Sequence, residues 1–423
     1  EIGKWLAVNG EAIYGTRYWK IFGEGPTQIK SGYFSDTDRS SFTSEDIRFT
    51  AKDGKLYAFF MKAPQNEICK IYSLGRRDPL FNTIVTKVTA LDTKEIEEIK
   101  QQLLDKDFRF TSQILNYGDT AKKEMEKKLK MVNRPLSFDF YSEDNNEYSL
   151  LHNIENKYKE TESYEVYLAL LMARTNSELA AIKEIAKKAM NDERFQNVAF
   201  VVFDTILETL EFDRFIEYQA NAICSGKHGY AEQTKSHTDN AKAIISDWMK
   251  DISSGTCTIY LKGQNSVISS RTLPSIINSS IAPNIFYSGP ESLEILRLKA
   301  PSTCWVKQFS NKTADTVLSF NTKDEITARC IGPAKHIQLL LQDSVDDNLQ
   351  FKSEVDTKHP LYVVSKFVKS RIDHTDKQNI FNFADKFREL TMPPYGLFKS
   401  HAGYGMLAFA LRPYVDKVFD TNG

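Results

Sequence analysis

The distribution of glycine divides this 423-residue chain into two parts of different architecture. Residues 1–95 hold 8 of the 19 glycines, whereas the remaining 328 residues hold 11. Formal charge changes little at the same point, from +2 before it to −3 after it. Glycine permits tight turns and weakens helices. The first part is therefore predicted to be rich in turns and strands, and the second to be mostly helical.

In the first part, β-branched and aromatic residues are concentrated in four runs that predict strands. These runs cover residues 46–50, 55–61, 67–74 and 84–91. Asp53-Gly54, between the first two runs, is typical of a two-residue hairpin turn. Short helices are predicted at residues 2–6 and 11–14, followed by a long loop through Gly15, Gly23 and Gly25. The expected result is an antiparallel β-meander.

After residue 95, apolar residues recur mainly at helical spacing. The predicted helices cover residues 94–104, 166–174, 179–190, 198–215, 236–251, 361–370, 380–390 and 404–410. A strand is predicted at 256–261, further strands are possible at 316–320 and 337–341, and residues 392–396 are predicted to form a turn. The fold class is therefore composite, with a short helix and antiparallel β-meander (a partial β-sandwich) at the N-terminal end and a mostly α-helical (α+β) C-terminal part.

The predicted domain boundaries follow this pattern. They are residues 1–30, a helix and connecting loop; 31–95, a partial antiparallel β-sandwich; 96–255, a helical domain; and 256–423, an α+β region that is mainly helical.

Composition excludes several function classes. The net charge of −1 gives no strong nucleic-acid signal, and the absence of 18 consecutive apolar residues predicts no membrane partner. The five cysteines lie 26 or more residues apart, so their spacing matches neither a zinc ribbon nor a redox pair. They are Cys69, Cys224, Cys257, Cys304 and Cys330. Reduced thiols are expected.

Phosphate-binding and magnesium-binding motifs are incomplete. Gly226-Lys227-His228 lacks the first glycine and the hydroxyl residue of a phosphate-binding loop. Residues 198–204 imitate a buried strand that ends in a magnesium-binding Asp204, but Ile206, Leu207 and Leu210 continue the apolar pattern at helical spacing. An ordinary buried helix is therefore favoured there.

Other candidate binding residues are predicted to have structural or solvent-exposed roles. The spacing of Cys224, His228 and His237 does not match a zinc signature. Asp343, Asp346 and Asp347 lack the glycine and the glutamate of a calcium loop. The basic run at 122–130 includes glutamates and predicts a solvated helix face. Gly403-Tyr404-Gly405 follows no strand, which disfavours a dinucleotide site. We assign no metal-binding, cofactor-binding or catalytic residue.

The first 95 residues resemble a known enzyme family. The run IGKWLAVNGEAIYGTR at residues 2–17 closely resembles the end of the catalytic barrel in retaining α-L-fucosidases. Residues 23–27 and 43–50 are similar to the passage of these enzymes into a C-terminal β-sandwich, and residues 73–75 and 88–91 continue the likeness. The resemblance implies a remnant of the last barrel helix at residues 1–30 and a hydrolase of terminal fucose.

The catalytic part of that family has no counterpart in this sequence. A retaining glycosidase needs two carboxyl groups roughly 5 Å apart, and the family carries them on a (β/α)8 barrel of about 250 residues. Those segments have no match here, so enzyme activity is uncertain and the chain alone is predicted to be inactive. Glu11, Glu24, Glu45 and Asp46 are expected to have structural or solvated roles. Arg17, Tyr18 and Trp19 suggest a sugar platform, but packing under a loop is favoured.

Residues from about 100 to 423 weakly resemble another family. The run Met392–Leu397, with 407–411 and 412–414, is similar to the post-ATPase region of large bacteriophage-exclusion-type P-loop ATPases, without their nucleotide site. The alternative function is therefore a helical interaction module with a possible protein partner. A fucosylated glycan is a partner only if a barrel is supplied. No signal peptide is visible; the fucosidase resemblance implies secretion or a periplasmic location, and the ATPase resemblance a cytoplasmic one.

Overall fold

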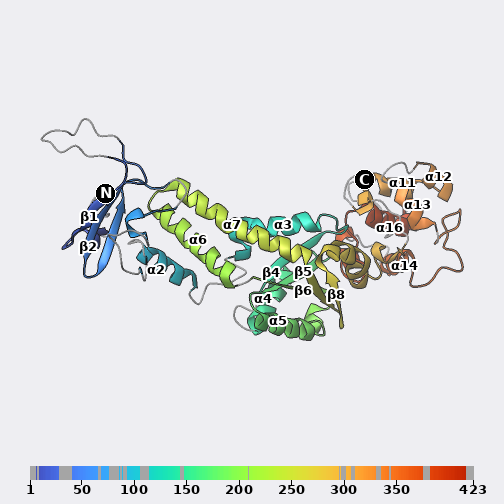
Figure 1. Cartoon of the computed structure of the whole chain (residues 1–423). Coiled ribbons are helices and arrows are strands. Elements are labelled where there is room, and N and C mark those ends of the chain that lie inside the picture. Colours follow the sequence, from blue (N-terminus) through green and yellow to red (C-terminus); the bar gives the residue numbers. More distant parts are fainter. Residues whose placement is uncertain are drawn as a thin grey trace. The chain divides into compact units, whose positions relative to one another are not determined.

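In a computed structural model the chain divides into two compact units (Figure 1). The first unit contains Glu1–Leu103 and Ile223–Gly229, and the second contains Leu104–Ala222 and Tyr230–Gly423. The structure describes residues 6, 9–27, 41–64, 68–75, 85, 88, 93–104, 114–142, 147–207, 209–294, 296, 302–305, 310–329, 335–342, 344–374 and 382–415.

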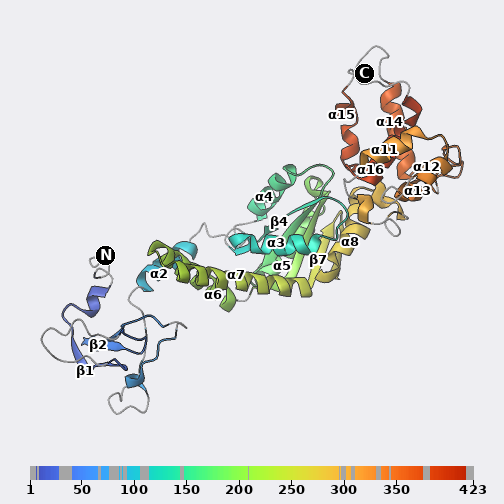
Figure 2. The ribbon, with the colours of Figure 1, turned by 90° about the horizontal axis from the view of Figure 1, so that it is seen from above.

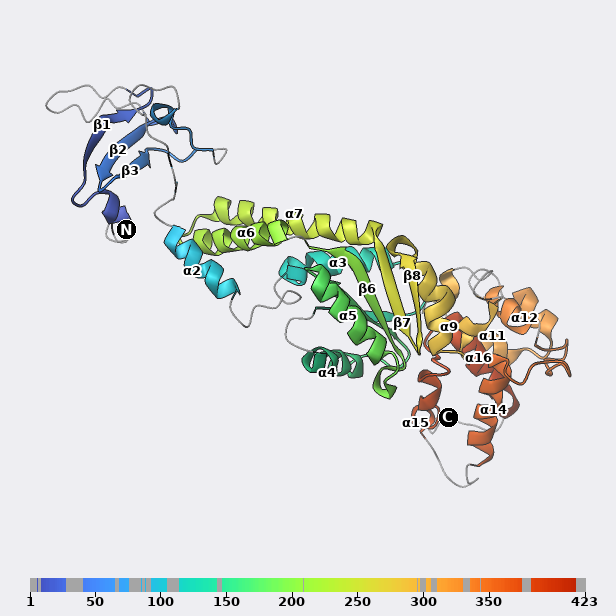
Figure 3. The ribbon, with the colours of Figure 1, turned by 60° about the horizontal axis from the view of Figure 1, so that its bottom comes forward.

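The first unit is built on a three-stranded antiparallel sheet with the order β1-β2-β3 (Figure 3). Its strands are β1 (Arg17–Glu24), β2 (Ile47–Lys52) and β3 (Lys55–Phe60). The predicted meander is confirmed. Asp53 (φ 49°) and Gly54 (φ 77°) form the turn between the paired residues Lys52 and Lys55. This positive-φ pair is the geometry that two-residue hairpins require.

Two predictions in the first unit are wrong. The predicted loop through Gly23 is largely strand β1, because Gly23 serves a close approach of strands: a Cβ there would lie 2.2 Å from the Ile47 carbonyl oxygen. The described part of the predicted strand 67–74 forms only a 3-10 turn, η2 (Tyr72–Leu74), which Glu24 fixes through backbone hydrogen bonds. The strand predicted at 84–91, apart from residues 85 and 88, and the helix at 2–6, apart from Leu6, lie outside the described residues.

The second unit contains a mixed five-stranded sheet with the order β4-β5-β6-β7-β8. The strands β4 (Leu136–Tyr141), β5 (Val166–Ala173) and β6 (Val198–Ile206) are parallel, whereas β7 (Thr256–Leu261) and β8 (Gln264–Ser269) pair antiparallel. Helices α4 (Glu147–Lys159) and α5 (Asn176–Ala189) connect the parallel strands and pack on one face of the sheet. Helices α3 (Thr120–Leu129) and α7 (Ala231–Ser254) lie on the other face (Figures 1 and 2).

The helices predicted at residues 166–174 and at the start of 198–215 are wrong, because both segments are strands of this sheet. All eight residues of β5 are buried, as are the first six of β6. A strand covered by helices on both faces has no polar alternation, so its apolar run cannot be distinguished from a buried helix by periodicity. Only the end of 198–215 is helical, in α6 (Thr209–Lys227).

Several predicted helices are confirmed, namely α2 (Thr93–Leu104), α5, α7, α14 (Pro360–Asp373) and the apolar α16 (His401–Leu411), as is strand β7. Residues 392–396 form the predicted turn, in which the Gly396 N–H donates to the Met392 carbonyl over 2.9 Å. The possible strands at 316–320 and 337–341 are wrong, because they lie largely in α11 (Ser310–Ser319) and in α13 (His336–Leu341), which pack against α16. The segment predicted as a helix at 380–390 is shorter, with α15 (Phe383–Lys386) and η11 (Arg388–Thr391).

The remaining elements are short. They are η1 (Gly10–Ala12), η4 (Tyr117–Asp119), η5 (Glu193–Phe195), η6 (Ser270–Thr272), α8 (Leu273–Ile276), the π-helix η7 (Ile277–Ile281), α9 (Ala282–Ile285), η8 (Pro290–Ser292), η9 (Ser302–Trp305), α12 (Lys323–Arg329) and η12 (Arg412–Tyr414). Among the helices that the structure describes, none has the length and apolarity needed to cross a bilayer.

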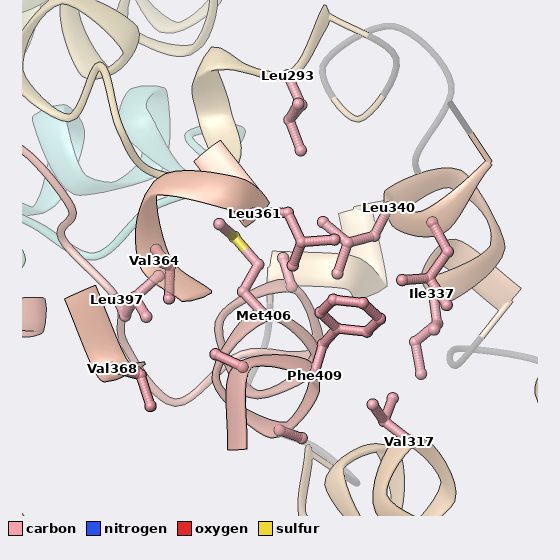
Figure 4. Close-up of a cluster of buried hydrophobic side chains, with 14 of the residues drawn as sticks. Leu293, Val317, Ile337, Leu340, Leu361, Val364, Val368, Leu397, Met406 and Phe409 are labelled. Carbon is pink, nitrogen blue, oxygen red and sulfur yellow. The ribbon is translucent and has the colours of Figure 1, made fainter. Parts of the chain in front are cut away.

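Helix α16 is the centre of a hydrophobic core in the C-terminal part of the second unit (Figure 4). It packs against α11, α13 and α14, and Met406 and Phe409 point into the cluster with Leu340 and Leu361. A helix surrounded by other helices has no solvated side. This explains why its sequence is apolar on nearly every face.

A buried ion pair connects this part of the unit to the sheet. The Arg134 and Glu291 side chains are only 1% and 3% exposed, and Arg134 Nε donates to Glu291 Oε1 over 2.6 Å. Arg134 Nη1 donates to the carbonyls of Tyr164 and Gly396, each at 2.7 Å. Its guanidinium carbon also lies 3.9 Å from the centroid of the Phe286 ring. One arginine therefore fixes four chain segments.

Replacing Arg134 by Met should destabilise the second unit strongly, because Glu291 would remain buried without its counter-charge. We expect the free energy of unfolding to fall by about 3–5 kcal/mol, measured by urea unfolding followed by far-ultraviolet circular dichroism. The double variant R134M/E291L should recover most of the loss. The matched control Arg194→Met, at a half-exposed surface pair, should cost less than about 1 kcal/mol. Equal effects of R134M and R194M would contradict this role.

Candidate functional site

Asp46 is held by several hydrogen bonds at the start of the sheet of the first unit. Its side chain is buried and accepts hydrogen bonds from the backbone N–H and hydroxyl of both Thr27 and Thr43, at 2.7–2.9 Å. Burial alone would raise its pKa, but these four donors outweigh burial and hold the pKa of Asp46 well below its usual range. The carboxylate therefore joins the chain before and after residues 28–42 to the start of β2.

The other three carboxylates of the segment occupy different places. Glu11 accepts hydrogen bonds from Lys55 Nζ at 2.8 Å and Tyr57 Oη at 2.6 Å, which lower its pKa. Glu24 accepts the backbone N–H groups of Tyr72 and Ser73, each at 2.8 Å. Glu45 is exposed. Glu11, Glu24 and Asp46 are thus engaged by the fold, whereas a glycosidase acid or nucleophile must face its substrate.

The aromatic residues next to Arg17 are divided between the core and the surface. Trp19 packs edge-on against Phe49, with ring centroids 5.4 Å apart. Tyr18 and Phe22 are 80% and 68% exposed, and the guanidinium of Arg48 lies 5.4 Å from the Phe22 ring centroid. Packing therefore accounts for Trp19 but not for Tyr18 and Phe22.

In the second unit, Asp204 lies on strand β6 and not on the helix favoured by the sequence pattern. Its Oδ1 accepts a hydrogen bond from Lys183 Nζ at 2.5 Å, and its Oδ2 accepts one from Thr256 Oγ1 at 2.5 Å. Both carboxylate oxygens are therefore occupied, one of them by an ammonium group. A lysine in the position of the cation disfavours a magnesium site at Asp204.

A second acidic residue of the sheet is part of a buried network. Tyr167 Oη donates to Asp139 Oδ2 over 3.1 Å and lies 2.5 Å from Tyr141 Oη. Burial raises the pKa of Asp139, of Tyr141 and of Tyr167. The phenols consequently remain protonated, as hydrogen-bond donors, and the network stabilises the pairing of β4 with β5.

A groove of about 470 Å³ lies beside α4 in the second unit. It is lined by Glu147, Tyr148, Leu151, His152, Glu155 and Arg194. Its charged groups are paired, with Arg194 3.1 Å from Glu155 and Lys188 3.2 Å from Glu147. The groove therefore presents a stacked Tyr148–His152 pair between neutralised charges.

The remaining motifs lie on surfaces or inside helices. The lysines of the 122–130 run are exposed except Lys128, whose Nζ donates to the Ser253 carbonyl over 3.4 Å. Asp346 accepts the backbone N–H groups of Asn348 and Gln350, as in an ordinary turn. Asp343 lies outside the described residues, and Gly403 and Gly405 are interior residues of α16. None of these residues forms a convergent site in the described part of the chain.

The structure does bring two of the sequence candidates together, with a third residue that the sequence analysis missed. Cys224, His228 and Glu95 place their ligand atoms within 4.8 Å of one another. Among the described residues these three form a group that could hold a metal ion, and His237 is not part of it. The four-residue spacing of Cys224 and His228 places both on one helix face, and this spacing is the sequence signal that predicts their proximity. Nothing local in the sequence connects either residue to Glu95.

Comparisons with known proteins agree with the resemblance in part. The chain is 30% identical over 90 residues to human tissue α-L-fucosidase, a match that covers 21% of this chain and 14% of the fucosidase. The chain thus matches only a small part of that enzyme, although the matched length is close to that of residues 1–95. No family model and no solved structure matches the chain. These comparisons support a partial fucosidase-like resemblance and give no support to the resemblance to ATPases.

Replacing Asp46 by Asn should destabilise the first sheet in a pH-dependent way. The folded-state pKa lies below the unfolded value of about 3.9. The carboxylate therefore stabilises the fold fully above about pH 5 and progressively less as the pH falls through 4. D46N should reduce hydrogen-exchange protection of peptides from residues 41–60 at pH 7, and the difference from the wild type should shrink toward pH 3.

The control for this variant is Asp53→Asn, at the exposed turn between β2 and β3. Asparagine tolerates the positive φ of that position, so protection should remain near the wild-type level at both pH values. A loss of protection in D46N that is the same at pH 7 and pH 3 would show that the charge of Asp46 is not what stabilises the sheet.

Proposed function

We propose that residues 1–95 are a non-catalytic segment of α-L-fucosidase type, joined to an α/β unit of separate origin, and that this chain does not hydrolyse fucosides by itself. The observation that carries this proposal is the set of sheets in the described residues. Three parallel strands, β4, β5 and β6, lie in an open mixed sheet. A (β/α)8 barrel needs eight parallel strands in a closed ring.

The surface of the first unit supports the proposal that residues 1–95 are a non-catalytic segment of α-L-fucosidase type. Tyr14, Tyr18 and Phe22, in and just before the edge strand β1, are 61%, 80% and 68% exposed. Three large aromatic residues exposed within nine positions are typical of a surface that normally contacts another protein segment. In a complete fucosidase-type enzyme, we infer that the catalytic barrel covers this surface. A fucosylated glycan would then be a substrate only where a barrel is supplied.

The alternative is a helical interaction module of a large P-loop ATPase, based on Met392–Leu397 and the helix after it. In the structure this run is a turn whose Gly396 carbonyl accepts a hydrogen bond from Arg134, which is a structural role. The alternative and its protein partner therefore stay predictions from sequence.

The purified chain should show no turnover of a chromogenic α-L-fucoside, because a facing pair of carboxylates is not supplied by Glu11, Glu24, Glu45 or Asp46. The assay should include a complete α-L-fucosidase as the positive control, at equal molar concentration. Turnover above the uncatalysed rate that is lost in E45Q or D46N would overturn the proposal. Turnover retained in all four carboxylate variants would place a catalytic pair elsewhere in the chain and would overturn it equally.

Limited proteolysis tests the composite architecture independently of activity. We expect the first cut between about residues 92 and 132, where the composition changes and chain connections are most easily cleaved. The product should be a C-terminal fragment that keeps its helical circular dichroism signal. Mass spectrometry of the fragments locates the cut. Protection of the intact 48.4 kDa chain as one body would contradict two separately built parts.

A further inference from the structure

We propose that Glu95, Cys224 and His228 form a binding site for a transition-metal dication, with zinc the metal that best fits the three donors. The ligand atoms are a carboxylate oxygen, a thiol sulfur and an imidazole nitrogen, all within 4.8 Å of one another. Glu95 comes from the first turn of α2, and the other two residues come from the C-terminal end of α6. All three belong to the first unit.

The local structure explains how Cys224 and His228 come to face the same point. Residues four apart lie on the same side of an α-helix. The backbone N–H of His228 donates to the Cys224 carbonyl over 3.2 Å, so helical spacing continues to His228. Gly229, with φ +77°, then ends the helix in the left-handed conformation. The two donors are therefore placed by backbone geometry, in the way that paired histidines are placed in helical zinc motifs.

The distances suit tetrahedral zinc after small side-chain rotations. With zinc–ligand bonds of about 2.0–2.3 Å, tetrahedral donors lie about 3.3–3.7 Å apart. His228 Nε2 and Glu95 Oε2 are now 2.8 Å apart, so they need to separate by less than about 1 Å. Cys224 Sγ lies within 4.8 Å of the other two donor atoms, so it needs to approach them by at most about 1.5 Å. Rotation of the Glu95 and His228 side chains supplies these movements.

Burial of the three residues leaves a solvent side for a fourth ligand. Cys224 is 6% exposed, whereas the side chains of Glu95 and His228 are 33% and 46% exposed. The thiolate would therefore bind from the protein side and water from the solvent side. Three protein ligands with one open position are typical of zinc sites that bind a water molecule. A thiolate with an imidazole disfavours magnesium and calcium, which prefer oxygen ligands.

Lys227 competes with the metal for Glu95. Its Nζ lies 3.6 Å from Glu95 Oε1, and its side chain is 53% exposed. A metal dication would repel this ammonium group, which is free to move into solvent. Removing the lysine charge should therefore strengthen metal binding, whereas removing any of the three ligands should weaken it. The opposite effects of these two kinds of substitution on metal affinity distinguish a metal site from a simple cluster of ion pairs.

The full-length chain, treated with a chelator and a reductant, should be titrated with Co²⁺ and then with Zn²⁺. We expect one equivalent of Co²⁺ to give a thiolate-to-cobalt charge-transfer band in the near ultraviolet, and Zn²⁺ to displace it. E95Q and H228N should weaken binding at least about tenfold, and C224S should abolish the band. K227Q should bind more tightly than the wild type.

Matched controls lie in the same unit. Glu98→Gln changes an exposed carboxylate on the same helix, and Cys69→Ser changes an exposed cysteine. Both controls should bind like the wild type. Cys224 is buried, so C224S can disturb folding; E95Q and H228N alter partly exposed side chains and are checked by circular dichroism. A charge-transfer band that persists in C224S, or equal affinities of E95Q and E98Q, would overturn the metal site.

Discussion

The buried charge of Arg134 sets the arrangement of the second unit. The guanidinium of Arg134 carries a delocalised positive charge, so a side chain that is 1% exposed must find its counter-charge and acceptors inside the protein. Glu291 and the carbonyls of Tyr164 and Gly396 provide them. A different packing of these segments would leave the guanidinium buried without partners. Removing one partner of such a pair is costly, because the other charge stays buried without its counter-charge.

Hydrophobic periodicity identifies an element clearly where one side of that element lies in water. Helices α2 and α5 have a polar face, so their apolar residues recur at helical spacing and reveal both type and extent. In β5 and in the first six residues of β6 every residue is buried. Their continuous apolar runs predict helices equally well. Residues 337–341 gave the opposite error, because α13 packs closely against α16 and its apolar run resembles a strand.

Prediction of the candidate sites from sequence has a similar limit, because the residues that come into contact there are distant in the chain. The Asp53-Gly54 turn is predictable because two adjacent residues decide it. The role of Glu24 is not, because its carboxylate accepts the N–H of Ser73, 49 positions away. Cys224 and His228 share a helix face that the sequence reveals, but Glu95 reaches His228 across 133 positions. Tertiary packing brings such residues into contact, and the sequence around each residue gives no sign of that contact.

The contacts of α2 connect two stretches of the first unit that lie far apart in the chain. The helix begins at Thr93, close to the composition break, and its first-turn carboxylate pairs with Lys227 and His228 at the end of α6. Ile99, in the middle of α2, is 3% exposed, so the helix also buries an apolar residue. Residues 223–229, at the end of α6, belong to the same compact unit as residues 1–103. The contact of Glu95 with Lys227 and His228 therefore helps to hold this stretch of α6 in the first unit, and the same contact brings Glu95 close to Cys224.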